Sequence, residues 1–82
     1  MLQPQAIQLV LKAQDGSEQE FRVLPSTRMH KVMSVYCTKR SLDPDSVNFL
    51  YDGDLLYGHK TVQQEFLEDG DEVQVMVHMV GD

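Results

Sequence analysis

The chain has no tryptophan and a single cysteine among its 82 residues. One cysteine cannot form a disulfide within the chain, and it suits a reducing compartment. No apolar run approaches the roughly 20 residues that a membrane-spanning helix needs, and no signal peptide opens the sequence. These absences predict one small soluble domain whose core relies on Phe, Tyr, Met and aliphatic side chains.

Basic residues are scarce, since seven stand against thirteen acidic ones for a formal net charge of −6. This balance argues against nonspecific binding to the phosphate backbone of nucleic acids. Six of the seven basic residues lie at or before Arg40, and ten of the thirteen acidic residues follow it. A fold that separates these halves would carry a basic patch and an acidic patch, each suited to a partner of opposite charge. A fold that mixes them would have an evenly solvated surface.

Hydrophobic periodicity predicts strands over 7–12, 20–24, 47–51, 54–57 and the closing run 72–82. Apolar residues at helical spacing predict a helix of about three turns that begins near Met29, with Ser26 or Thr27 as its N-cap. A single helical turn is expected over 61–66. The order β-β-α-β-β-β predicts an α+β fold in which a mixed sheet packs on one helix.

A resemblance to a known family runs without a gap from Ile7 to the C-terminus. The motifs that carry it are Gln14-Asp15, Phe21-Arg22-Val23, Tyr36-Cys37, the run 46–53 and the run 68–72. In this order and spacing, the chain resembles the SUMO family of small ubiquitin-related modifiers, and the runs 36–40 and 68–72 are most similar to plant members. The resemblance implies a ubiquitin-like β-grasp fold with the closing strand in mid-sheet and the second strand at an edge. It divides the chain into a short leader (1–6), a SUMO-like domain (7–76) and a C-terminal tail (77–82).

The first surface that the resemblance implies is a groove between the second strand and the helix. In the family, a short hydrophobic peptide with acidic flanks docks there as an added strand. The chain departs from the family pattern at Gln19, Glu20 and Leu24, which predicts an altered or weaker peptide preference. Without the resemblance, the aromatic and aliphatic residues concerned could equally be core. The matching residues are Phe21, Val23, Val32 and Tyr36 for the pockets, and Arg22, Lys31 and Lys39 for the basic rim.

The second implied surface is acidic. Leu55 departs from the family pattern there, because a basic residue is usual at that position. The alternative is that the carboxylates are only solvated turn residues. The residues that match the family's noncovalent site for its conjugating enzyme are Asp52, Gly53, Glu68 and Asp71.

The third implied surface is the C-terminal tail. Family members end, after processing, in two glycines, and the terminal carboxylate is then joined to a lysine. Glycine is needed because a side chain would obstruct the narrow channels of the processing and activating enzymes. The matching pair here is Gly81-Asp82, and the preceding Val77, Met79 and Val80 are more apolar than is usual. We therefore expect conjugation to be poor or absent.

No catalytic or metal site is predicted. Cys37 and His30 could suggest a nucleophile and its base, but no third orienting group is evident. The three histidines and Cys37 lack the spacing of metal ligands, and the acidic turns at 52–54 and 68–71 lack the span of a calcium loop. We expect no enzymatic activity, no cofactor, and no binding to nucleic acid or membrane.

The predicted function is that of a noncovalent protein-interaction module of the SUMO family. The resemblance implies a monomer of nucleus and cytoplasm that binds SUMO-interacting peptides and the SUMO-conjugating enzyme, with the SUMO protease and activating enzyme as further candidate partners. The alternative is a true SUMO modifier, attached to target lysines through a C-terminal glycine that is altered or truncated in this chain. A β-grasp sulfur carrier would need a terminal Gly-Gly, and a β-grasp ferredoxin would need four cysteines.

Overall fold

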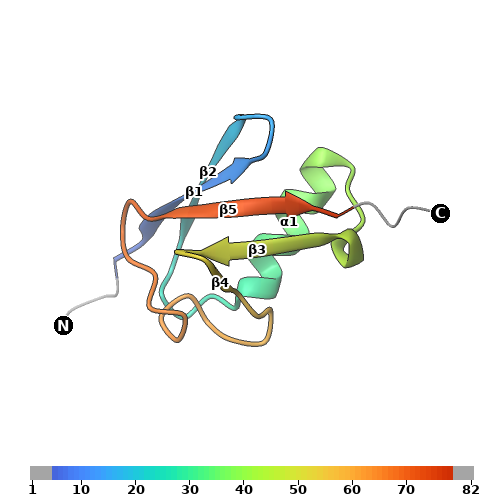
Figure 1. Cartoon of the computed structure of the whole chain (residues 1–82). Coiled ribbons are helices and arrows are strands. Elements are labelled where there is room, and N and C mark those ends of the chain that lie inside the picture. The colour runs from blue at the N-terminus through green and yellow to red at the C-terminus, as the bar shows by residue number, and fades with distance from the viewer. Residues whose placement is uncertain (1–4, 79–82) are drawn as a thin grey trace.

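The computed structural model describes residues 5–78, which form a five-stranded mixed sheet with one α-helix across it (Figure 1). The strand order is β2-β1-β5-β3-β4, with β1 and β5 parallel and the other neighbours antiparallel. The predicted element order is confirmed, as are the central place of β5 and the edge place of β2. In chain order the elements are β1 (Ile7–Ala13), β2 (Glu18–Val23), α1 (Met29–Arg40), the 3₁₀ turn η1 (Pro44–Ser46), β3 (Val47–Tyr51), β4 (Asp54–Leu55) and β5 (Glu72–Val77).

Alternation along the strands decides which side chains face α1. Leu9 and Leu11 of β1 are fully buried, and Val73 and Val75 beside them on β5 are buried as well. Because the side chains of a strand alternate between its two faces, these residues line one face of the sheet while the residues between them face solvent. The core is completed by apolar residues of α1, of β3 and of the segment after β4: Met29, Val32, Tyr36, Cys37, Val47, Phe49, Leu56, Val62 and Leu67.

The start of α1 corrects one prediction. The helix begins at Met29 as predicted, but its N-cap is Arg28 rather than Ser26 or Thr27, and Arg28 makes no side-chain cap bond. Two of its first backbone N–H groups instead donate to carbonyls of the 57–61 loop, from Met29 to Lys60 (2.8 Å) and from His30 to Gly58 (3.0 Å). Hydrogen bonds from a distant segment therefore satisfy donors that a local cap would have satisfied.

The segment after β4 holds the expected single helical turn. The Thr61 hydroxyl accepts from the Gln64 backbone N–H (3.1 Å), while the Gln64 side chain accepts from the Thr61 N–H (2.9 Å). This reciprocal pair is a capping box, and the Glu65 N–H then donates to the Thr61 carbonyl (3.1 Å). The backbone of this turn is therefore held at its start by its own side chains.

β5 ends at Val77, within the predicted run 72–82 and one residue into the tail that the resemblance assigned to 77–82. Val77, placed by the sequence at the start of the tail, pairs with Val47, and its N–H donates to the Gln14 side chain (3.0 Å). The His78 N–H donates to the Ser46 carbonyl (2.9 Å). The predicted tail pair Gly81 and Asp82 lies outside the described residues. Within residues 5–78, no helix is long and apolar enough to cross a membrane.

Candidate functional site

A groove of about 280 Å³ lies between β2 and α1. β2 is the terminal strand of the sheet, and among the described residues it pairs with β1 alone. The groove lies along the edge of β2 that this pairing leaves open. That edge leaves backbone donors and acceptors available to a further strand. The residues that line the groove are Phe21, Arg22, Val23, Leu24, Thr27, Lys31, Val32 and Val35.

Five of the seven residues predicted for this groove line it, and two do not. Tyr36 is only 1% exposed and supports the groove from the core, with its ring 6.4 Å from the Phe21 ring and 5.9 Å from the Phe49 ring. Lys39, near the end of α1, is exposed but is not a lining residue. The structure therefore separates the supporting ring of Tyr36 from the side chains that an incoming peptide would touch.

Sequence reasoning missed three lining residues. Val35 lies three residues after Val32, a helical spacing that could have identified it. Leu24 was noted only as a departure from the family pattern, yet at 44% exposed it extends the apolar wall. Thr27 carried no such signal, because it lies in the irregular connection whose path depends on the distant 57–63 segment.

A polar cluster ties the β1–β2 turn to the end of α1. The Ser17 hydroxyl donates to Asp15 Oδ1 (2.6 Å) and accepts from Arg40 Nη2 (2.7 Å), and the Arg40 guanidinium lies 5.4 Å from the centre of the Tyr36 ring. The hydrogen bonds from the Ser17 side chain and backbone lower the pKa of Asp15. Burial raises the pKa of Tyr36. The cluster therefore links the β1–β2 turn to the end of α1.

The predicted acidic residues come together around Tyr51. Interaction with the Asp71 side chain, followed by burial and by the charges of Asp71, Asp52 and Glu68, raises the pKa of Tyr51. Asp71 also accepts from the Glu68 backbone N–H through Oδ2 (2.7 Å). Three carboxylates from two separate turns therefore form one acidic face, with Tyr51 as the residue that the sequence did not identify.

The geometry of the β3–β4 turn places Asp52 on this face. Asp52 and Gly53 both have positive φ (53° and 86°), as in the tight turns that match the twist of a hairpin. The strands pair on either side of them, Tyr51 with Asp54 and Leu50 with Leu55. Leu55 is 42% exposed, so the departure from a basic residue leaves an apolar side chain at this edge.

The metal-ligand and nucleophile candidates weighed from the sequence can be located in the structure. Between residues 5 and 78, no three His, Cys, Asp or Glu side chains lie close enough to hold a metal ion. Cys37 is 1% exposed, and burial raises the pKa of its thiol. A neutral, buried thiol is a poor nucleophile because the thiolate is the reactive form.

Comparisons with known proteins agree with this architecture. A family model described as "Ubiquitin-2 like Rad60 SUMO-like" matches residues 7–77. Small ubiquitin-related modifier 2 of Arabidopsis thaliana is 43% identical over 75 residues, which cover 92% of this chain and 73% of that protein. Small ubiquitin-related modifier 2 of Xenopus tropicalis is 31% identical over 75 residues, covering 92% and 79%. The structure of a Caldiarchaeum subterraneum ubiquitin superposes with a TM-score of 0.84 over 94% of this chain and 99% of that one, and its 24% identity supports the ubiquitin-like β-grasp fold alone.

Proposed function

The chain belongs to the SUMO-like family of ubiquitin-fold proteins, and we propose that it acts as a noncovalent protein-interaction module. It binds short peptides in the β2–α1 groove and the basic conjugating enzyme at the acidic face. The observation that carries the proposal is the open edge of β2, which faces α1 across an apolar groove with Arg22 and Lys31 on its rim. Nuclear and cytoplasmic localisation is part of the same proposal, as is the division into leader, domain and tail, with the domain now ending at Val77, the last residue of β5.

Peptide binding in the groove follows from the chemistry of a strand edge. Main-chain hydrogen bonds to β2 supply affinity, and apolar pockets formed with Val35 and Leu24 select the alternate side chains of the added strand. Arg22 and Lys31 attract acidic residues that flank the peptide's apolar core. Glu20, exposed on the same strand, opposes that attraction and is expected to weaken binding of strongly acidic peptides.

A titration with a hydrophobic peptide that has acidic flanks tests the groove. We expect amide NMR signals to shift at 21–24 and 31–35 and not at 52–54 or 68–71. Lys31→Ala should weaken binding about two- to fivefold, the range of an exposed charge pair, and added salt should reduce the difference. Lys12→Ala is the matched control, because Lys12 is exposed on β1 and does not line the groove. Equal weakening by both variants would contradict a specific role for the rim.

The acidic face is tested with the conjugating enzyme itself. Asp71→Asn removes one charge yet keeps an oxygen that can accept from the Glu68 N–H. It should weaken noncovalent binding of the enzyme, whereas Asp54→Asn, on the neighbouring exposed strand, should change it little. Binding that is equally sensitive to both would indicate attraction to the net charge rather than a defined face.

The alternative role as a conjugated modifier has its own test. Incubation with the SUMO-activating enzyme and ATP should give no thioester with the chain as it stands, because Asp82 adds bulk and charge where the family has glycine. The variant Asp82→Gly should form one. A thioester of the unchanged chain through Asp82 would instead favour the conjugated role.

A further inference from the structure

Phe66 is the most exposed large apolar residue among those described, at 83%. It ends the short helical turn that begins at Thr61, and its φ of 62° is left-handed. The Phe66 N–H donates to the Gln63 carbonyl (3.0 Å), and the Leu67 N–H donates to the Val62 carbonyl (3.2 Å). This bond pattern is a Schellman motif, in which the residue with positive φ is usually glycine.

The motif explains how Phe66 is held outward. Val62 and Leu67, its neighbours in the motif, form the apolar pair that commonly accompanies it, and both are buried (0% and 5% exposed). The turn cannot rotate to hide the Phe66 ring without exposing one of them. A large aromatic residue therefore occupies a position that favours glycine and cannot use burial in its own core as compensation.

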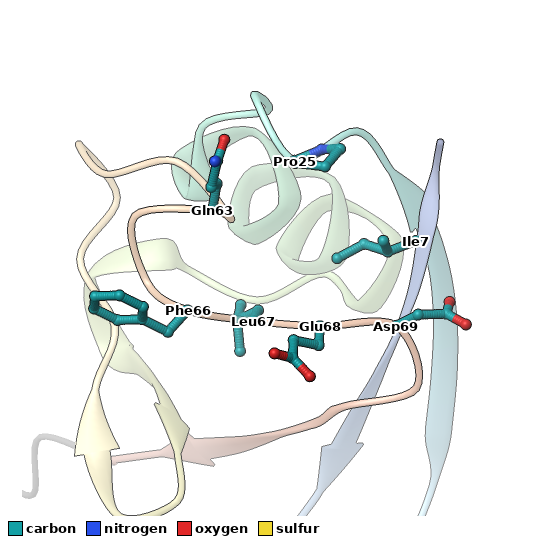
Figure 2. A pocket seen from close by; sticks show the side chains of 7 residues that line it. All are labelled: Ile7, Pro25, Gln63, Phe66, Leu67, Glu68 and Asp69. Carbon is teal, nitrogen blue, oxygen red and sulfur yellow. The ribbon is translucent and has the colours of Figure 1, made fainter. Parts of the chain in front are cut away.

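Beside Phe66 lies a groove of about 550 Å³ that shares no lining residue with the β2–α1 groove. Figure 2 shows Phe66 at one end of the row of lining residues and Asp69 at the other, with Ile7 and Pro25 facing the row. The walls are fixed by backbone bonds between distant segments, from Gln63 to Pro25 (2.9 Å) and from Gly70 to Gln8 (2.8 Å). The groove is therefore preformed, which lowers the entropic cost of filling it.

The charges around this groove indicate what occupies it. Glu68 and Asp69 line it, and no lysine, arginine or histidine does. One Asp69 oxygen accepts from the Gln8 N–H (2.7 Å), which holds the carboxylate in place and leaves its second oxygen for a partner. A second copy of the chain would bring the same carboxylates against them, and like charges repel. A partner with positive charge beside an apolar group complements the groove.

We propose that this groove, named here the Phe66 groove, is a docking surface for a short segment of a partner protein. The segment carries one bulky aliphatic or aromatic side chain that enters the groove beside Phe66 and packs against Ile7 and Pro25. Lysine or arginine next to that side chain pairs with Asp69 and Glu68. The preference is opposite in charge to that of the β2–α1 groove, so the two grooves take different partners.

Selection from a displayed library of random short peptides tests the proposal. The library is first depleted on immobilised Phe66→Gly and then selected on the unchanged chain. We expect enrichment of sequences with an aromatic or aliphatic residue beside Lys or Arg. The most enriched peptide, titrated by NMR, should shift the amides of Ile7 and of 63–69 and leave those of 21–24 unchanged.

Variants of Phe66 and Asp69 measure how much each side chain contributes to binding of the selected peptide. Phe66→Gly and Phe66→Asn, both compatible with left-handed backbone, should each weaken binding about tenfold or more, as for an aromatic anchor. Asp69→Asn should weaken it about two- to fivefold. None of them should change binding of the acidic-flanked peptide to the β2–α1 groove, so this proposal and the proposed function can fail separately. Met76→Ala, which truncates an exposed apolar residue of β5, is the control.

Three outcomes would overturn the proposal. The first is that no peptide is enriched on the unchanged chain after depletion on Phe66→Gly. The second is that the enriched peptides have acidic flanks and shift the amide signals of β2. The third is a dimer in sedimentation of the chain alone that Phe66→Gly abolishes, since the occupant would then be a second copy.

Discussion

Replacing Phe66 by glycine is expected to leave the protein at least as stable as the unchanged chain. The left-handed backbone at φ 62° costs a residue with a Cβ about 1–2 kcal/mol, which glycine does not incur. Glycine loses about 0.5–1 kcal/mol more conformational entropy on folding than alanine does. The backbone terms therefore favour glycine over alanine at this position by about 0.5–1 kcal/mol.

The lost side-chain contacts are small by comparison. Fully burying a phenylalanine is worth up to about 3 kcal/mol, and Phe66 is 83% exposed, so its contacts contribute about 0.5 kcal/mol or less. Phe66→Ala should lose those contacts and keep the backbone cost, and so be slightly less stable than the unchanged chain. Phe66→Gly should be more stable than Phe66→Ala by about 0.5–1 kcal/mol and no less stable than the unchanged chain.

Urea denaturation followed by circular dichroism measures the difference. With a slope of about 1 kcal/mol per molar urea for a small domain, the midpoints of the Ala and Gly variants should differ by about 0.5–1 M. Gly70→Ala is the control, because Gly70 has φ +89° and an added Cβ there would meet no atom within 4 Å. Its effect should have the opposite sign for the same backbone reason. A glycine variant of Phe66 less stable than the alanine variant would refute the reasoning.

Three further predictions concern titration and reactivity. The pKa of Asp15 is lowered from 3.8, so the stabilisation that its charge provides is present above pH 3.8 and is lost as the pH falls through the folded-state pKa. In urea denaturation, Asp15→Asn should therefore make the free energy of unfolding less dependent on pH in the acid range. The pKa of Tyr51 is raised from 10.0, so its contribution to the free energy of unfolding is present below pH 10.0 and is lost as the pH rises through the folded-state pKa. When tyrosinate absorbance is titrated, Asp71→Asn should move the Tyr51 transition back toward 10.0, and Tyr51→Phe identifies which transition belongs to Tyr51. The buried Cys37 thiol should react slowly with a thiol reagent in the native state, because the reagent reaches it only when the domain opens. Val75→Ala, which destabilises the core by about 2 kcal/mol, should therefore accelerate labelling. An unchanged labelling rate would show that the reagent reaches the thiol without unfolding.

Most of the secondary structure could be predicted because its signals are local. The 47–51 strand has the predicted bounds, and the helical stripe of Met29, Val32 and Tyr36 is buried as its spacing indicates. Alternation in a strand and the helical period each report which face meets the core. Strand order came from the family resemblance instead, since alternation alone does not say which strands are neighbours.

The features that could not be predicted depend on distant segments. The N-terminus of α1 is completed by carbonyls of Gly58 and Lys60, which no local capping pattern reveals. The left-handed backbone of Phe66 is similar, because phenylalanine does not signal positive φ as glycine or asparagine would. A weak signal was present in the Thr61–Gln64 capping box and in the five-residue spacing of Val62 and Leu67, which together outline a capped helical turn.

Charge would separate the partner of the β2–α1 groove from the partners of the other two proposed surfaces. The β2–α1 groove presents Arg22 and Lys31, whereas the acidic face and the Phe66 groove present carboxylates. The acidic face and the Phe66 groove share Glu68, so a basic enzyme at one and a basic peptide at the other would compete for it. The β2–α1 groove shares no residue with either and could be filled at the same time. One small domain could thus hold an acidic-flanked peptide together with one of two basic partners, but not both.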